Sequence, residues 1–230
     1  MEEHFALNAD LNAIAFANTA SMPWEASPSP TVWRKRLHLS GSAEAGVVTS
    51  IVRYDAGASF RAHGHPGGEE IFVLDGTFSD EHGDWPVGTY LLNPEGFSHA
   101  PFSTGGCVLF VKLRQYAGAR SQLALDTTSR DWEATGEPGV SMKVLYRVSG
   151  FPEHTSLERW DGRQQPRALT NTRGLELLVL AGECEWVPHP GVGKALVGGP
   201  GTWLRFPPGA SARCRSLGGC ELFVKRDHLA

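Results

Sequence analysis

Four side chains with metal-binding chemistry lie in the first half of the sequence. His63 and His65 are two residues apart, Glu69 follows them closely, and His99 lies further along the chain. Imidazole nitrogens with one carboxylate oxygen form a mixed ligand set that suits a borderline divalent ion, with Fe or Zn favoured and Mn, Ni and Cu left open. Such a set can leave coordination positions for water or substrate. The pattern predicts one divalent metal ion on these four residues.

The residues around the ligands predict how the chain brings them together. Residues two apart on a strand project from the same face, so the two neighbouring histidines are expected side by side. A Pro-Gly-Gly turn leads from them to Glu69, which is expected to open an antiparallel strand beside them. His99 follows a Pro-x-Gly turn and is expected to approach from the opposite wall of a barrel. By the same alternation, Arg61 and Phe97 are guessed to line a substrate pocket.

The rest of the sequence predicts short strands joined by turns. The chain has 27 Gly and 15 Pro, which is typical of many turns and few long helices. Apolar runs that read as antiparallel strands lie at residues 47–54, 69–78, 88–94 and 107–113. Only residues 10–20 suggest a helix. The fold class is therefore all-β, as a barrel or sandwich.

The chain contains an internal repeat. Residues 88–112 and 201–225 are identical at more than half of their positions without a gap. A repeat of about 110 residues indicates two domains, because solenoid repeats are much shorter. The predicted division is an N-terminal arm, a metal-binding barrel, a linker and a second barrel without ligands, at residues 1–24, 25–116, 117–138 and 139–230.

The second copy lacks the ligands of the first. Aligned on the repeat, Ala168, Thr170 and Ala212 take the three histidine positions, and Leu175 takes the glutamate position. The second barrel is expected to be structural, or at most an empty pocket.

Composition excludes several classes of function. The net charge is -4, with 20% charged and 41% hydrophobic residues, so no basic face for nucleic acid is expected. No apolar stretch is long enough for a membrane helix, and the acidic N-terminus does not resemble a secretory signal. The four cysteines form no C-x-x-C pair. A cytoplasmic protein with a small-molecule ligand or substrate is expected, and a homodimer is left open.

Other polar residues receive simpler interpretations. The stretch with Asp80, His82 and Asp84 is expected to be a surface turn. Glu70 should point away from the metal, because its neighbour points toward it. Cys107 and Cys220 occupy matching positions of the two copies and are expected to be buried apolar residues.

The two boxes that carry the ligands resemble the signature motifs of the cupin superfamily, except that Ser103 stands where the second motif usually ends in Asn. The stretch from residue 65 to residue 101 most resembles the ChrR-like cupins, named for the metal-binding domain of an anti-sigma factor. The resemblance implies two tandem jelly-roll (double-stranded β-helix) barrels, a bicupin, and the same four metal ligands. It does not imply sigma-factor binding, which belongs to a separate helical domain. Relatives of this type include iron dioxygenases that cleave carbon–carbon bonds beside a ketone.

Three functions remain open from the sequence. The favoured one is a non-haem metal-dependent dioxygenase, an oxidoreductase, on a small ketone or enolisable substrate. The second is a non-catalytic ChrR-like metal-binding sensor or regulatory protein. The third is a Zn- or Mn-dependent isomerase or hydrolase. Enzyme and sensor are not distinguished by the sequence, since one fold hosts many functions.

Overall fold

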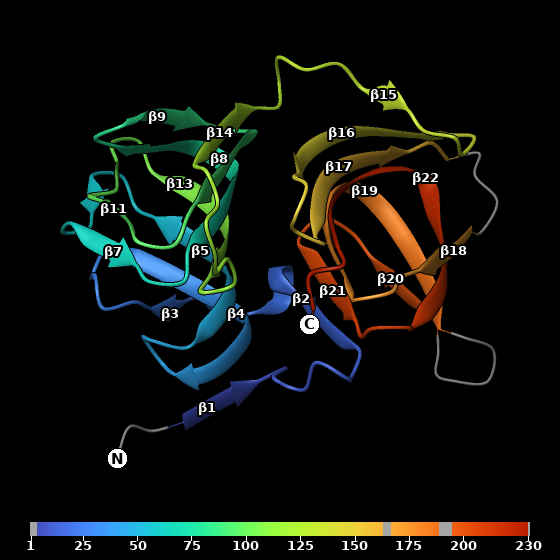
Figure 1. Ribbon diagram of the computed structural model, residues 1–230, viewed down its shortest axis with the longest axis horizontal. Helices are drawn as coiled ribbons and strands as arrows, with labels where there is room; N and C mark the ends of the chain where they lie inside the picture. Colours follow the sequence, from blue (N-terminus) through green and yellow to red (C-terminus); the bar gives the residue numbers. More distant parts are fainter. Residues whose placement is uncertain (1–3, 163–166, 189–194, 230) are drawn as a thin grey trace. The chain divides into compact units, whose positions relative to one another are not determined.

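The computed structural model describes residues 4–162, 167–188 and 195–229 (Figure 1). These residues fold into two compact β units. The first unit contains residues 1–9 and 22–129, and the second contains residues 10–21 and 130–230. The all-β prediction is confirmed, and each unit is a barrel of antiparallel strands.

The first unit is built on one large sheet. Its main path runs β1-β4-β5-β13-β8-β10-β14, with β3, β6, β9 and β12 joined at the sides, while β7 and β11 form a separate pair. The strands are β1 (His4–Leu7), β3 (Glu25–Ala26), β4 (Val32–Ser42), β5 (Val47–Tyr54), β6 (Ala58–Ser59), β7 (His63–His65), β8 (Glu69–Asp80), β9 (Gly83–Pro86), β10 (Thr89–Asn93), β11 (Phe97–His99), β12 (Phe102–Ser103), β13 (Cys107–Leu113) and β14 (Leu123–Asp126).

The second unit repeats this arrangement. Its path runs β15-β16-β17-β22-β19-β21-β2, with β18 on β22 and β20 on β19. The elements are β2 (Ala15–Asn18), the 3-10 turn η1 (Thr19–Ser21), β15 (Glu133–Ala134), β16 (Val140–Arg147), β17 (His154–Trp160), β18 (Arg167–Thr170), β19 (Leu175–Pro188), β20 (Leu196–Gly198), β21 (Thr202–Phe206) and β22 (Ser211–Arg226). The order β4-β5-β13-β8-β10 thus corresponds to β16-β17-β22-β19-β21.

The four apolar runs of the first copy are strands, as predicted. β5 and β13 match the expected bounds, and β8 and β10 differ from them only at their ends. Alternate residues of these strands point into the barrel and form an apolar cluster that includes Ile71, Val73 and Leu109. Burial of this face drives the sheet to close.

The helix expected over residues 10–20 is absent, and this prediction was wrong. Residues 15–18 are the strand β2, which pairs antiparallel with β21. A helix of eleven residues is marginal in water, whereas the edge of β21 offers the segment backbone hydrogen bonds. The arm at residues 1–24 is therefore divided between the units, with β1 in the first and β2 in the second. The expected linker at residues 117–138 contributes β14 and β15 to the two sheets.

No helix among the described residues is long and apolar enough to cross a membrane.

Candidate metal centre

The four predicted ligands, called here the His/Glu cluster, lie together in the first barrel. Each of the three imidazoles offers a nitrogen within 4.8 Å of the others. The Nε2 atoms of His65 and His99 are 3.0 Å apart, and Glu69 Oε2 lies 3.5 Å and 3.6 Å from them. His65, Glu69 and His99 are buried, whereas His63 is exposed. Among the four residues, solvent therefore reaches His63 most readily.

Three strands position the cluster. β7 carries His63 and His65, and it pairs antiparallel with β11, so that His99 lies directly opposite His63. The expectation that His99 comes from the opposite wall of the barrel was wrong, because β7 and β11 pair directly and place the histidines on neighbouring strands. Glu69 opens β8 of the large sheet, and Gly68 before it has a positive φ of 72° that lets the chain turn from one sheet to the other.

The hydrogen bonds of the ring nitrogens show that the cluster fits a metal ion. His63 Nδ1 lies 2.9 Å from the Arg61 carbonyl oxygen, which can only accept, so this nitrogen carries the proton. His99 Nδ1 lies 3.1 Å from Asp80 Oδ2, and it donates to that carboxylate in the same way. The Nε2 atoms of both rings are then left with a lone pair. Metal-binding histidines are held by this arrangement.

The electrostatics of the cluster also favour a cation. Burial raises the pKa of Glu69, although His99 and the amide of Asn93, which donates to Oε2 over 3.0 Å, act against this shift. Burial, together with the nearby charges of His63 and Arg114, lowers the pKa of His65 to about 4. At neutral pH that imidazole is uncharged, which is the form that binds a metal. A divalent ion would supply the positive charge that a buried carboxylate requires.

A cavity of about 870 Å³ opens onto the cluster. Its walls are mostly apolar, with residues of β4, β5, β8 and β13 that include Val52, Ile71 and Leu109. Tyr54 also lines it, and burial raises the pKa of its hydroxyl well above 10, so the phenol stays protonated. A space of this size can enclose a small organic molecule beside the cluster.

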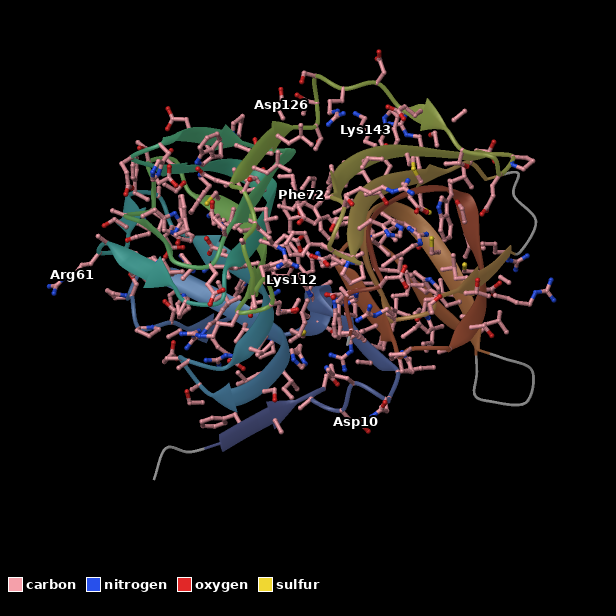
Figure 2. All side chains as sticks on the ribbon, viewed as in Figure 1. Asp10, Arg61, Phe72, Lys112, Asp126 and Lys143 are labelled. Atoms are coloured by element: carbon pink, nitrogen blue, oxygen red, sulfur yellow. The ribbon has the colours of Figure 1, made fainter. Side chains whose placement is uncertain are left out.

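The two guessed pocket residues have different positions. Arg61 is among the residues that line the cavity, but its side chain is exposed and extends away from the barrel (Figure 2). Phe97 is not among the lining residues. Its ring instead packs against the rings of His99 and His82, with centroids 5.5 Å and 5.1 Å apart. Phe97 therefore helps to hold the ring of His99 in place.

Asp80 has a role that the sequence did not reveal. It was assigned to a surface turn, but it is buried at the end of β8, and its carboxylate holds His99. Its other oxygen accepts from the backbone N–H of His82. Asp80, Glu81 and His82 also bring ligand atoms within 4.8 Å of one another, but the contact with His99 already occupies Asp80. Asn93, which holds Glu69, was also missed.

The remaining polar residues behave more simply. Glu70 faces away from the cluster, and its carboxylate accepts from the hydroxyls of Tyr90 and Tyr116 over 2.6 Å and 2.5 Å. Ser103, which departs from the expected motif, donates to the Thr77 carbonyl over 2.6 Å. Burial raises the pKa of Cys107 to about 11, so its thiol is uncharged.

In the second barrel none of the corresponding positions carries a histidine or a carboxylate. His99 pairs with His63 in the first barrel, and in the second Ala212 pairs with Leu169. Leu169 thus corresponds to His63, and Asn171 to His65. The sequence alignment with Ala168 and Thr170 was therefore wrong by one residue.

The partners of the ligands are replaced as well. The pair of Glu69 with Asn93 corresponds to Leu175 with Phe206, since each pair is matched across its own sheet. Leu169, Leu175, Phe206 and Ala212 all belong to the apolar core of the second barrel. Apolar side chains thus take most of the positions that correspond to the His/Glu cluster and its partners.

Comparisons with known proteins agree with this architecture. The ChrR cupin-like domain family matches residues 12–117. No curated protein was found to match the sequence. A candidate glyoxylate-induced protein from Pseudomonas aeruginosa is similar in structure, with a TM-score of 0.76 and 13% identity over 93% of this chain and 88% of that one.

Two further solved structures are similar over nearly the whole chain. A candidate dioxygenase from Nostoc punctiforme has a TM-score of 0.72 and 16% identity, over 94% of this chain and 84% of its own. A mutant oxalate decarboxylase from Bacillus subtilis has a TM-score of 0.67 and 10% identity, over 94% and 78%. At these identities the likeness establishes the fold alone. With two repeated barrels, and a His/Glu cluster in the first, the chain has the fold of two tandem cupin barrels, and its first barrel matches the ChrR cupin-like domain family.

Proposed function

We propose that the His/Glu cluster holds one divalent metal ion, and that the first barrel is a non-haem metal-dependent dioxygenase acting on a small ketone or enolisable compound. The observation that carries the proposal is the cavity of about 870 Å³, which is lined both by the cluster and by apolar side chains. The cavity gives an organic molecule room beside the metal, which metal sensing alone does not require. The likeness to a candidate dioxygenase adds support.

The residues of this chain have distinct tasks in the proposed reaction. A bound metal would supply a Lewis acid and, if it is iron, redox chemistry with oxygen. Glu69 balances part of the charge of the ion, and Asn93 fixes the orientation of that carboxylate. The apolar walls exclude water, and the protonated hydroxyl of Tyr54 is available to donate to a substrate oxygen.

Oxygen uptake tests the proposal. Protein purified without oxygen and loaded with Fe(II) should consume oxygen only when a β-diketone or aryl ketone is added. Glu69→Gln should reduce the rate at least about tenfold, because it removes the charge and keeps the size of the side chain. Its melting temperature should change little. Glu133→Gln, on an exposed strand of the second barrel, is the matched control and should retain the full rate.

The alternatives predict different results. The match to the ChrR cupin-like domain favours a metal-binding sensor as the second candidate. A protein that retains only zinc and consumes no oxygen with any ketone would contradict the dioxygenase. The sensor and the Zn- or Mn-dependent isomerase or hydrolase would then remain. Conversion of a ketone without oxygen would indicate the isomerase or hydrolase, and no conversion would indicate the sensor.

A further inference from the structure

Arg114 is a cationic residue at the wall of the cavity. It directly follows β13 and lines the same space as the His/Glu cluster. Its charge lies close enough to the His65 imidazole to act on it. The guanidinium has only a long contact of 3.5 Å to the backbone oxygen of Glu44, which is at the limit of a hydrogen bond. Within the described part of the chain, no carboxylate pairs with it.

The neighbouring arginines already have carboxylate partners. Both terminal nitrogens of Arg34 donate to Glu44, one of them over 2.9 Å. Arg36 binds Glu25 over 2.8 Å and reaches Glu44 over 3.4 Å. The carboxylates of Glu44 and Glu25 therefore pair with Arg34 and Arg36, and neither of them pairs with Arg114.

A comparison with the second barrel shows which features of Arg114 belong to the fold and which to its side chain. Arg114 has a φ of 60°, and Asp227, its counterpart in the repeat, has a φ of 58°. Their backbone N–H groups donate to Gly68 and Gly174 in the same way. The left-handed conformation thus belongs to the fold. Only the side chain differs, and the arginine is found in the barrel that contains the His/Glu cluster and the cavity.

We propose that Arg114 binds a carboxylate of the ligand, so that the substrate is a small organic acid. The inference rests on the proposed function, because the ligand's keto or enol oxygen would face the His/Glu cluster in the same cavity. The planar guanidinium can donate two parallel hydrogen bonds to a carboxylate. The apolar walls suit the carbon chain between the two ends.

Three related probes test the charge of the ligand. Succinylacetone is an enolisable β-diketone with a carboxylate tail, its methyl ester lacks the charge, and acetylacetone lacks the tail. Binding is measured by calorimetry on the zinc-loaded protein, which performs no redox chemistry. Succinylacetone should bind about tenfold to a hundredfold more tightly than its ester, as expected for a charge-assisted hydrogen bond.

Variants of the arginine identify the residue responsible. Arg114→Asn should bind the acid no better than the ester, with the affinity for the ester unchanged. Asn tolerates a positive φ, so this variant is expected to fold and to hold one zinc. Arg114→Lys should retain part of the preference, because it keeps the charge and loses the fork. Arg147→Asn, at an exposed position of the second barrel, should behave as wild type.

The outcomes separate the two proposals. Equal binding of the acid and its ester by the wild-type protein would overturn the carboxylate inference alone. So would a preference that survives in Arg114→Asn. Failure of all three probes to bind the zinc-loaded protein would overturn both this inference and the ketone substrate proposed above.

Discussion

At the scale of single residues, His99 is held at both of its ring nitrogens. Nδ1 faces Asp80 and Nε2 faces His65. The Asp80 carboxylate thus fixes both the tautomer and the orientation of the His99 ring. His63 is held by a backbone carbonyl instead, and no side-chain substitution can remove that acceptor. Asp80 is therefore the position at which the support of a ligand can be tested by mutation.

We expect Asp80→Asn to weaken zinc binding about tenfold to a hundredfold. The amide cannot serve as a charged acceptor for the Nδ1 proton, so the ring loses its fixed tautomer and part of its basicity. A chelator competition assay measures the change. Glu81→Gln, at the exposed neighbouring residue, is the control and should bind zinc as wild type. Equal effects of the two substitutions would contradict the role of Asp80.

The same residues show how far a sequence leads to the site. That the side chains of the His/Glu cluster lie together could be predicted, because their types and spacing in the sequence are rare. Asp80 and Asn93 could not, since each is defined by a partner on another strand. Arg114 gave no signal either, because its place at the cavity depends on how the end of β13 meets the turn at Gly68.

At the scale of elements, β8 bends at Gly76. Gly76 has a φ of 69°, and a Cβ there would lie 2.2 Å from the Gly106 carbonyl oxygen. Its repeat counterpart Gly182 has a φ of 71° and a similarly close carbonyl. Both barrels thus need a residue without a side chain at the point where β8 or β19 changes partners.

Gly76→Ala should destabilise the protein by about 2 kcal/mol or more, from left-handed strain and a backbone clash together. Gly57→Ala is the matched comparison, because Gly57 also has a positive φ but its Cβ would meet nothing within 4 Å. It should cost only about 1 kcal/mol. Urea unfolding measures both values. A Gly76 variant no less stable than the Gly57 variant would show that the chain relieves the clash by moving.

The strands themselves were easier to predict than their partners. Apolar runs bounded by turns predicted the bounds of β5 and β13, because the apolar residues that one face buries lie within each segment. Register is a property of two segments, and a shift of one residue exchanges the faces. That is why His99 was placed on the wrong wall and the counterparts of His63 and His65 were displaced by one position. The N-terminal strand β2 was missed for the same reason, since only β21 makes it a strand.

At the scale of the whole molecule, the two repeats have the same sheet order and different interiors. The first has polar ligands, their polar partners and a cavity, and the second has an apolar core at the same positions. Apolar packing increases stability, whereas a pocket lined by buried polar groups reduces it. The division between a stable barrel and a functional one follows from this difference.

One equivalent of metal per chain is therefore expected, measured by elemental analysis of washed protein. His99→Ala should abolish tight binding, because it removes a buried ligand. His154→Ala, at the start of β17 in the second barrel, should retain the full equivalent. His189 would be a second control, but it lies outside the described residues. Two equivalents in the wild-type protein would show that the second barrel also binds metal.

The pairing of β2 with β21 has a consequence for how the chain is made. Ala15 pairs with Arg205, so the two residues are separated by about 190 positions, and loop closure over such a distance is slow. At a synthesis rate of roughly 5 to 20 residues per second, β2 waits on the order of 10 to 40 s for its partner to be translated. The large sheet of the first barrel can close during that interval. A segment that is translated before the first barrel therefore becomes hydrogen-bonded only after that barrel is complete, and a chain halted before residue 202 would carry β2 as an unpaired strand.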